Sequence, residues 1–425
     1  MVRGAVRRPA GHGGGDRARA AAVAVLLLAL VAGCSGGSDP GLPAPPGQGA
    51  PTSSSPTTPT PPLPPAAKIA VTPADGTQGF SVLRPVVVTA TAGTLTSVEV
   101  TNAEGRRLRG ALDARRTSWS SSEQLGYDRS YSVVAVAANA AGKLTRSSSS
   151  FGTLLPRTLT LPYLFPGNGA TVGVGQPITV RFDEPIADKA AAERALTVST
   201  SPQVAGAWHW FSDQVVHWRP KTYWTPGTRV SVRASVYGVH VGDDVYGQQD
   251  TSSSFRIGTS KIATIDDRTH MMTVRISGKA VRSIPVSMGR GGATVVDGRS
   301  IYFTTQSGPH IVAEKYPIKQ MSSETYGLPK DSPLGYDEKI PLAVRISPDG
   351  EFVHAASWSV ADQGVRNVSH GCVNISPANA DWFYHTFSYG DIVDIKNTGV
   401  ALPFAPSYDE WSVSWSTWLA GSALR

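Results

Sequence analysis

Short runs in which apolar and polar residues alternate recur along much of the chain after residue 66. They fall at residues 131–136, 230–234, 261–265, 272–276 and 280–284. A two-residue period turns one side of a segment toward a core and the other toward water, which is typical of half-buried β-strands. The composition, with 43 glycines and 32 prolines, favours turns over long helices. The pattern therefore predicts a mainly β protein.

One segment predicts a helix, from Pro377 to about Phe387. Ser376 can cap its first turn, and Pro377 suits the first helical position because its missing N–H is not needed there. Trp382 and Phe383 supply an apolar face. We expect this helix to support a neighbouring sheet.

The chain repeats itself between residues 67 and 259. Three pairs of similar segments lie 92 to 104 residues apart, at 71–76 and 164–169, 85–88 and 177–180, and 148–151 and 252–255. Regular turns and a length near 100 residues for each copy predict two tandem immunoglobulin-like β-sandwiches that lack a cysteine pair. We place them at residues 67–155 and 156–259.

The N-terminus has the pattern of an export signal. An arginine-rich start precedes an apolar stretch at residues 18–31, which is too short to span a bilayer comfortably. Residues 30–34 resemble a bacterial lipobox, so we expect cleavage after residue 33 and a lipid on Cys34; ordinary cleavage with Cys34 incidental is the alternative. Residues 34–66 are rich in proline, serine and threonine and predict an extended spacer. The expected location is outside the cytoplasm, lipid-anchored to the cell membrane and facing the cell wall.

Charge and cysteine content narrow the function. The formal charge of +7 includes a net +4 from the predicted signal peptide, and what remains is too mild to indicate nucleic-acid binding. The chain has two cysteines, so lipid on Cys34 would leave Cys372 as a single thiol with no possible intramolecular disulfide. An unpaired cysteine in an exported protein indicates a reactive thiol.

Cys372 has a candidate base upstream. Because a thiol is nucleophilic only as the thiolate, it needs a base within hydrogen-bond reach. His354 can supply one if the glycine-containing chain between them loops back. Gly371 lets the backbone approach a substrate carbonyl, so the N–H groups of Gly371 and Cys372 are candidate oxyanion donors.

At these residues the chain resembles the peptidoglycan L,D-transpeptidases. His354, fourteen intervening residues, and then Ser369, His370, Gly371, Cys372 and Asn374 match the signature of that family. The resemblance covers roughly residues 260–400, and it implies a β-rich catalytic domain at 260–398 followed by a tryptophan-containing tail at 399–425. Ala355 stands where relatives often carry serine; its backbone carbonyl is what would orient His354.

The resemblance also implies roles for residues that chemistry alone would not single out. The polar segment between residues 318 and 345 lacks periodicity and would be a lid. Tyr336 in it would line the oxyanion hole, Tyr326 would shape the donor pocket, Met321 would begin the lid, and Trp358 would form a pocket wall. His370 and Asn374 would fix the catalytic loop, with His370 as the rival base.

The implied reaction is acyl transfer by Cys372. The thiolate attacks the L-centred residue of a tetrapeptide stem, releases D-alanine, and passes the acyl group to the amine of a second stem as a 3-3 cross-link. No cofactor is implied. The expected partners are peptidoglycan stem peptides and the membrane, and carbapenem-type β-lactams are expected as covalent inhibitors.

Three rival interpretations remain open. A thiol-dependent L,D-carboxypeptidase would pass the acyl group to water, and a non-catalytic scaffold would bind the wall through its sandwiches. A metal site formed by His354, His370 and Cys372 lacks a fourth ligand nearby. His209 and His217, in an aromatic cluster of the second sandwich, have no acidic or thiol companion in the sequence and make a poor metal site.

Two groups of aromatic residues predict packing. Trp208, Trp210, Trp218 and Trp224 of the second sandwich favour a core or a domain joint over a glycan-binding surface. In the tail, the spacing of Trp411, Trp415 and Trp418 puts their rings on one side of a helix, or they cover an irregular segment. In either case we expect them to fasten the tail to a neighbouring module.

Overall fold

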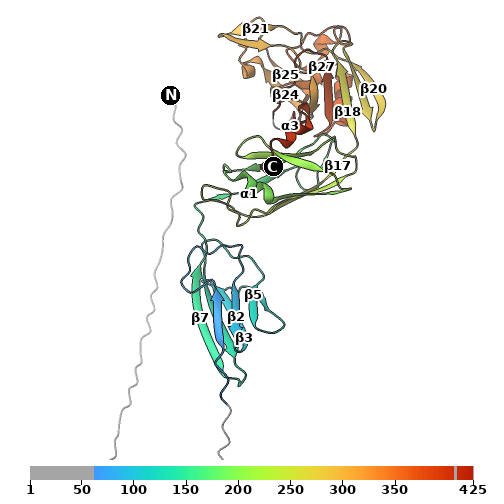
Figure 1. Cartoon of the computed structure of the whole chain (residues 1–425). Coiled ribbons are helices and arrows are strands. Elements are labelled where there is room, and N and C mark those ends of the chain that lie inside the picture. The colour runs from blue at the N-terminus through green and yellow to red at the C-terminus, as the bar shows by residue number, and fades with distance from the viewer. Residues whose placement is uncertain (1–61, 406–408, 425) are drawn as a thin grey trace, which may run out of the picture. The chain divides into compact units, whose positions relative to one another are not determined.

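The computed structural model describes residues 62–405 and 409–424 (Figure 1). The predicted signal peptide, the predicted lipidation site at Cys34 and nearly all of the predicted spacer lie outside these residues. Within them, no helix is both long and apolar enough to cross a bilayer.

The first module is a sandwich of two antiparallel sheets. Its strands are β1 (Lys68–Thr72), β2 (Val87–Thr91), β3 (Thr94–Asn102), β4 (Gly110–Leu112), β5 (Ser118–Ser121), β6 (Ser130–Ala138) and β7 (Leu144–Gly152). One sheet has the order β1-β2-β5-β4 and the other β3-β6-β7. Val88, Trp119 and Val133 are buried between the sheets.

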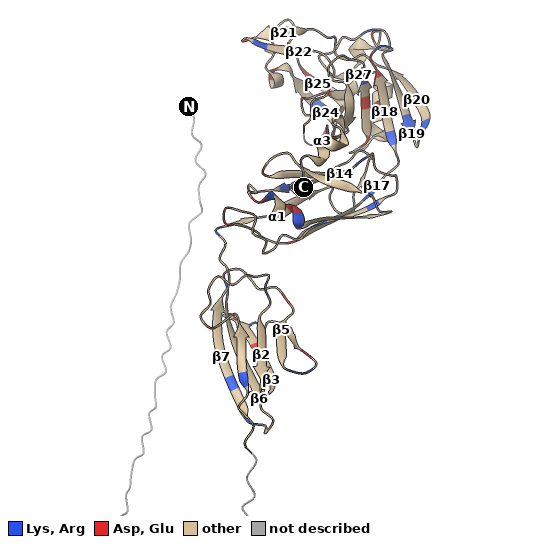
Figure 2. Cartoon of the chain, in the orientation of Figure 1, with Lys and Arg blue, Asp and Glu red and all other residues tan. Residues whose placement is uncertain are grey.

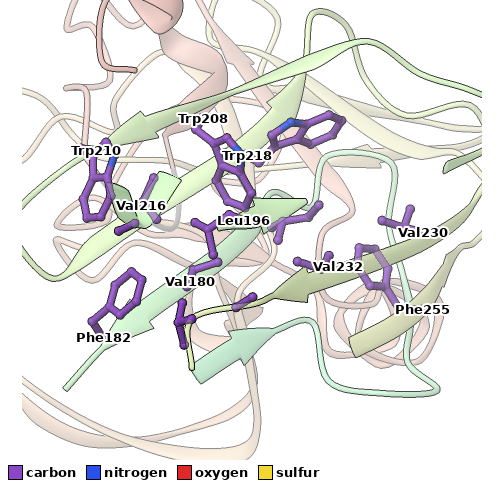
Figure 3. Close-up of a cluster of buried hydrophobic side chains, with 14 of the residues drawn as sticks. Val180, Phe182, Leu196, Trp208, Trp210, Val216, Trp218, Val230, Val232 and Phe255 are labelled. Atoms are coloured by element: carbon purple, nitrogen blue, oxygen red, sulfur yellow. The ribbon is translucent and has the colours of Figure 1, made fainter. Parts of the chain in front are cut away.

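The second module is also a sandwich, with sheets ordered β10-β17-β15-β12 and β13-β14-β11-β9. Its elements are β8 (Thr158–Thr160), β9 (Pro162–Phe165), β10 (Thr171–Val172), β11 (Ile178–Phe182), α1 (Lys189–Arg194), β12 (Leu196–Ser201), β13 (Gly206–Trp210), β14 (Val215–Pro220), β15 (Arg229–Ala234), β16 (Val245–Gly247) and β17 (Thr251–Ile257). Trp208, Trp210 and Trp218 point into the core between the sheets (Figure 3), so the packing interpretation of these rings is confirmed.

The catalytic region has two larger sheets, one ordered β20-β19-β18-β28-β23 and one ordered β24-β25-β26-β27. Its strands are β18 (Lys261–Asp266), β19 (Met271–Ile276), β20 (Lys279–Pro285), β21 (Ala293–Val296), β22 (Arg299–Tyr302), β23 (Gly308–Ile311), β24 (Glu314–Ser322), β25 (Asp337–Arg345), β26 (Phe352–Ala355), β27 (Val373–Ile375) and β28 (Ile392–Lys396). Short 3₁₀ turns occur at Ser323–Tyr326, Ser357–Ser359 and Glu410–Ser412, and the helices are α2 (Pro377–Thr386) and α3 (Trp415–Leu419). Strands dominate, which confirms the predicted mainly β organisation.

The core of the catalytic region lies between its two sheets. Ile265 and Val274 of the first sheet pack with Val353 and Val373 of the second, and Phe383 of α2 joins the same core. The predicted helix is confirmed: Ser376 caps it through the Asn379 amide, and Pro377 occupies the first turn. The helix α1 was not predicted, and α3 lies in the tail segment for which a helix was one of the two expected forms.

The second module is joined closely to the catalytic region. The backbone amides of Gly173 and Gly175 donate to the carbonyls of Tyr389 and Gly390, at 2.7 and 2.8 Å. A Cβ on Gly173 would lie 2.2 Å from the Asp391 nitrogen, so only glycine permits this approach. Ile392 is also part of the hydrophobic core of the second module.

The tail fastens onto the second module, as predicted. Trp411, Trp415 and Trp418 surround the guanidinium of Arg219, with its carbon 4.6, 5.4 and 4.5 Å from the three ring centroids. The indole of Trp418 donates to the Ala207 carbonyl at 2.9 Å. These contacts hold both ends of the tail helix against β13 and β14.

One sequence interpretation of this module was wrong. His217 does have an acidic companion, because Glu410 of the tail places Oε1 2.7 Å from its Nδ1. Both side chains are fully buried. The two residues are 193 positions apart, so only the folded tail brings them together.

The predicted domain limits at 155/156 and 259/260 fall in the breaks between β7 and β8 and between β17 and β18. They stay predictions. Lysine, arginine, aspartate and glutamate residues are scattered over the strands and loops of the described modules (Figure 2).

Candidate active site

His354 and the residues around Cys372 share one face of a sheet. β26 and β27 are parallel neighbours in which His354 lies opposite Asn374, and Val353 lies opposite Val373. Val353 and Val373 point into the catalytic core. Because successive side chains of a strand alternate between faces, His354, Asn374 and Cys372 lie on the other face. The predicted nucleophile, one residue before β27, and the predicted base on β26 therefore lie on the same face of this sheet.

This face forms the floor of a cavity of about 300 Å³. It is lined by Met321, Tyr336, Glu338, Ile340, His354, Trp358, Ser359, Asp362, Val368, Ser369, His370, Cys372 and Asn374. Eight of the predicted site residues are in this lining, whereas Gly371, Tyr326 and Ala355 are not. The cavity brings together residues from the lid segment, from β26 and from the loop before β27.

Cys372 is held as a neutral thiol. Its side chain packs beside Met321 and Phe352, and its sulfur lies 3.8 Å from the Gly350 carbonyl oxygen. Burial raises the pKa of the thiol from 9.0 to about 12; the Phe352 backbone hydrogen bond acts to lower this pKa, and the charge of Glu351 acts to raise it. A partner must therefore remove the proton before the sulfur can attack.

His354 is placed to be that partner. Its Nδ1 lies 3.0 Å from the Ala355 carbonyl oxygen, which can only accept, so Nδ1 carries the proton and Nε2 has the free lone pair. Burial lowers the pKa of His354 to about 4, and the Ala355 carbonyl partly offsets this. The imidazole is thus neutral near pH 7 and able to take a proton.

The loop before Cys372 is fixed by Ser369. Its hydroxyl donates to the Cys372 carbonyl at 2.6 Å and accepts from the Gly371 amide at 3.1 Å. Gly371 has a φ of +141°, a conformation that favours glycine. The Gly371 amide is therefore engaged by Ser369, and this geometry does not direct it into the cavity as an oxyanion donor.

His370 tethers the lid. Its Nε2 lies 2.8 Å from the Leu334 carbonyl oxygen and also contacts the Arg290 guanidinium. Its ring is 5.1 Å from the ring of Tyr336. Burial, followed by the charge of Arg290, lowers the pKa of His370. With Nε2 already engaged, His370 is a weaker candidate for the base than His354.

The lid segment is more regular than its sequence indicated. β24 and β25 pair from Glu314–Arg345 to Ser322–Asp337, so only residues 323–336 form the connecting loop. The prediction of an irregular segment from 318 to 345 was wrong because the burial of these strands does not alternate cleanly, which hides the two-residue period.

Both predicted lid tyrosines lie close to the cavity. Ser323 pins the loop by hydrogen bonds with the Tyr336 backbone, and the rings of Tyr326 and Tyr336 are 6.3 Å apart. Burial is the main cause that raises the pKa of Tyr336, so its hydroxyl keeps its proton and can donate a hydrogen bond. Tyr326 supports Tyr336 from behind the lining.

Trp358 and Asn374 have different roles in the wall. Trp358 is 57% exposed, and its ring stacks on His354 with centroids 5.9 Å apart. Asn374 is buried and donates to the Ser359 hydroxyl at 3.0 Å. Trp358 thus leaves ring surface for a ligand, whereas Asn374 fastens the wall.

Metal binding has no support from this arrangement. Within the described ranges, no three His, Cys, Asp or Glu residues lie close enough together to hold a metal ion. One ring nitrogen of His354, Nδ1, and one of His370, Nε2, lie within hydrogen-bond distance of backbone carbonyl oxygens.

Comparison with known proteins shows which families the chain resembles. The bacterial Ig domain family matches residues 77–240, and the L,D-transpeptidase catalytic domain family matches residues 260–395. L,D-transpeptidase 2 of Mycobacterium tuberculosis is 43% identical over 357 residues, which cover 84% of this chain and 85% of that protein. The chain belongs to the L,D-transpeptidase family.

A second relative, L,D-transpeptidase 5 of Mycobacterium tuberculosis, is 36% identical over 365 residues, 84% of this chain and 78% of that protein. Two solved L,D-transpeptidase structures also match. One, in complex with imipenem, is 34% identical, covers 57% of this chain and 100% of that chain, and has a TM-score of 0.47. The other is L,D-transpeptidase 3 of Mycobacterium tuberculosis in complex with a faropenem-derived adduct. It is 30% identical, covers 55% of this chain and 97% of that chain, and has a TM-score of 0.45.

Sequence reasoning missed five lining residues of this L,D-transpeptidase: Glu338, Ile340, Ser359, Asp362 and Val368. Glu338 and Ile340 line the cavity two and four residues after Tyr336, but β25 shows no clear alternation from which the sequence could indicate them. Ser359, Asp362 and Val368 belong to the irregular chain between β26 and β27, where no period exists.

Proposed function

We propose that this enzyme is a peptidoglycan L,D-transpeptidase in which Cys372 is the nucleophile and His354 the base. The observation that carries the proposal is the shared sheet face: both side chains line one cavity, and the free lone pair of His354 is on Nε2. Buried, neutral partners suit general-base activation, because the thiolate needs to exist only as it attacks.

The first half-reaction releases D-alanine. His354 Nε2 takes the thiol proton, and the sulfur forms a bond to the carbonyl carbon of the L-centred residue of a tetrapeptide stem. The C–N bond to D-alanine then breaks, and the leaving amine takes the proton back from His354. A thioester on Cys372 remains, and all protons are accounted for.

The second half-reaction forms the cross-link. A neutral amine of a second stem attacks the thioester carbon, and His354 takes the proton that the amine loses. The C–S bond breaks, and the departing thiolate recovers that proton as the 3-3 amide is released. The same residues thus serve both halves.

The oxyanion of each tetrahedral intermediate has two candidate donors, the Tyr336 hydroxyl and the Cys372 amide. Removing one such donor typically costs about 10²–10³ in rate. The Gly371 amide would join them only after releasing Ser369. Met321 forms cavity wall, and Tyr326 holds Tyr336 in place.

The alternative function is an L,D-carboxypeptidase, in which water replaces the acceptor amine. The cavity favours it to the extent that its exposed wall at Trp358 admits water. A wall-binding scaffold without catalysis is a weaker alternative, because it gives no role to the Cys372–His354 arrangement.

Location and inhibition complete the proposal. The lipobox-like residues 30–34 support an enzyme anchored by lipid on Cys34 outside the cytoplasm, with the two sandwiches between membrane and active site. A carbapenem carbonyl would be attacked by the same thiolate, and the names of two relatives record complexes with imipenem and a faropenem-derived adduct.

Product analysis tests the function. The protein is incubated with a tetrapeptide stem, with and without an acceptor amine, and D-alanine and cross-linked dimer are quantified. We expect both products, and neither with Cys372→Ala. Release of D-alanine without any dimer would favour the carboxypeptidase, and wall binding without either product would favour the scaffold.

A further inference from the structure

A carboxylate in the cavity wall has no role in the chemistry described so far. Glu338 lies on β25 opposite Met321 of β24, and both residues line the cavity. Tyr336 and Ile340, two positions away on either side, line it too. The two-residue period of the strand therefore turns Glu338 toward the same space as the candidate oxyanion donor. The charge of Glu338 acts on this part of the cavity, because it contributes to the raised pKa of Tyr336.

Glu338 differs from the other carboxylate of the lining. Asp362 accepts from the Arg366 guanidinium at 2.6 Å, which offsets its charge. Glu338 is exposed and makes no side-chain hydrogen bond or ion pair within residues 62–405 and 409–424. Burial keeps His354, His370 and Cys372 neutral near pH 7. Of the two carboxylates in the lining, Glu338 is thus the one without an ion-pair partner among the described residues; the Arg290 guanidinium contacts His370 and is not part of the lining.

The two half-reactions use such a charge differently. The donor carbonyl that Cys372 attacks is neutral, so the first half gains nothing from a carboxylate. The acceptor of the second half is an alkyl amine, which is mostly an ammonium ion at neutral pH. An ammonium arriving at the thioester would meet Glu338 within the same cavity.

We propose that Glu338 is a specificity-determining residue that receives the ammonium group of the acceptor stem. The proposal rests on the proposed transpeptidase function. The ammonium binds beside Glu338, loses one proton to solvent as it moves to the thioester, and attacks as the neutral amine. His354 takes the second proton and returns it to the departing Cys372 sulfur. Glu338 selects a cationic acceptor over water and takes no part in bond making.

The expected effect is on acceptor binding. Because Glu338 is exposed, its attraction is modest, and Glu338→Gln should raise the acceptor KM about 2- to 5-fold. Cross-linking should fall relative to hydrolysis of the thioester by a similar factor. Added salt should raise the acceptor KM of the wild type and change that of the variant little.

The test compares Glu338→Gln with Glu324→Gln in the full-length protein. Glu324 is an exposed lid residue outside the cavity lining, so the control removes the same charge nearby. Three quantities are measured with a tetrapeptide donor: the rate of Cys372 acylation by intact mass, the acceptor KM for a stem with a free amine, and the ratio of dimer to hydrolysed product. Hydroxylamine, a neutral nucleophile, replaces the stem amine in a parallel series.

The proposal expects Glu338→Gln to change only the amine-dependent quantities, with acylation and the hydroxylamine reaction unchanged and Glu324→Gln like the wild type. It is overturned if the dimer ratio is unaffected, if both half-reactions fall together, or if Glu324→Gln behaves the same. Normal acylation of Cys372 together with an unchanged acceptor KM in Glu338→Gln would overturn the role of Glu338 and leave the proposed transpeptidase function standing. No Cys372 adduct in the wild type would overturn the proposed function as well.

Discussion

Two regions of this enzyme are rich in aromatic residues, and they use them in opposite ways. At the joint between the tail and the second module, Trp418 is fully buried and its indole N–H is bonded to the Ala207 carbonyl. At the active site, Trp358 is 57% exposed and covers His354 with one face only. Residue type does not distinguish the two regions. Exposure does: the joint uses its rings for packing, and the cavity leaves ring surface available.

Charged groups follow the same division. The joint buries Arg219 among three tryptophans and pairs His217 with Glu410. The active site keeps Cys372 and His354 neutral and leaves Glu338 exposed. Changes at the joint should therefore alter stability, and changes at the cavity should alter chemistry.

The largest effect should come from the base. His354→Ala removes the group that takes the thiol proton, so the rate of Cys372 acylation should fall by about 10²–10⁴. Stopped-flow or quenched mass spectrometry with a stem peptide measures it. Circular dichroism should show an unchanged fold. A variant that acylates at the wild-type rate would transfer the role to His370, which His370→Ala then checks.

Next, a pair of tryptophan substitutions tests directly whether the joint controls stability and the cavity controls chemistry. Trp418→Ala should destabilise the fold by about 3–5 kcal/mol, because a fully buried ring is lost. Trp358→Ala should change Tm little and lower kcat/KM about 2- to 10-fold through lost stacking. Denaturant unfolding and steady-state kinetics on both variants measure this. The contrast between the joint and the active site is contradicted if Trp418→Ala and Trp358→Ala lose the same amount of stability and the same factor in kcat/KM.

A smaller effect concerns the pH dependence of the thiol. Since burial raises the pKa of Cys372 to about 12, little thiolate is present at pH 7.5. Alkylation by iodoacetamide should be at least tenfold slower than in the unfolded protein and should still be rising at pH 10. A plateau reached below pH 8 would indicate a preformed ion pair with His354 instead.

The smallest effect lies at the joint. Asp409 is fully buried, and burial followed by Glu410 raises its pKa from 3.8 to about 8. The unfolded chain loses this proton above pH 4 and the folded chain only near pH 8. The associated stability is therefore lost as pH rises through this window. Asp409→Asn cannot ionise, so its Tm should exceed that of the wild type by about 2–4 °C at pH 8.

The control for this variant is pH 4, where the two Tm values should converge. Glu351, whose pKa is also raised to about 8 by burial, is present in both proteins and cancels in the difference. A Tm difference that does not change with pH would mean that Asp409 is already neutral or solvated in the fold.

What the sequence could predict was set by local signals. The strands of the sandwiches follow a two-residue period, and α2 follows its Ser376 cap and Pro377 start. The spacing of His354 and Cys372 placed both in the cavity because β26 and β27 are neighbours in the sheet. The short helix α1 also had a local signal that was overlooked, since Asp188 caps it through the Ala191 amide.

What it could not predict depends on contacts distant in sequence. Glu410 reaches His217 across 193 residues, and nothing near either residue indicates the pair. The Gly371 amide was expected to donate to the oxyanion, but it donates a hydrogen bond to the hydroxyl of Ser369 instead. Glu338 was missed because the strand that presents it is half-exposed and carries no clear alternation.

The central claim is that Cys372 forms the acyl-enzyme. Intact-mass measurement of the mature protein after incubation with a tetrapeptide stem, followed by peptide mapping, tests it most directly. The account predicts an added mass equal to the stem minus D-alanine, located on Cys372 and absent from Cys372→Ala. An adduct that persists in Cys372→Ala, or maps to another residue, would contradict it.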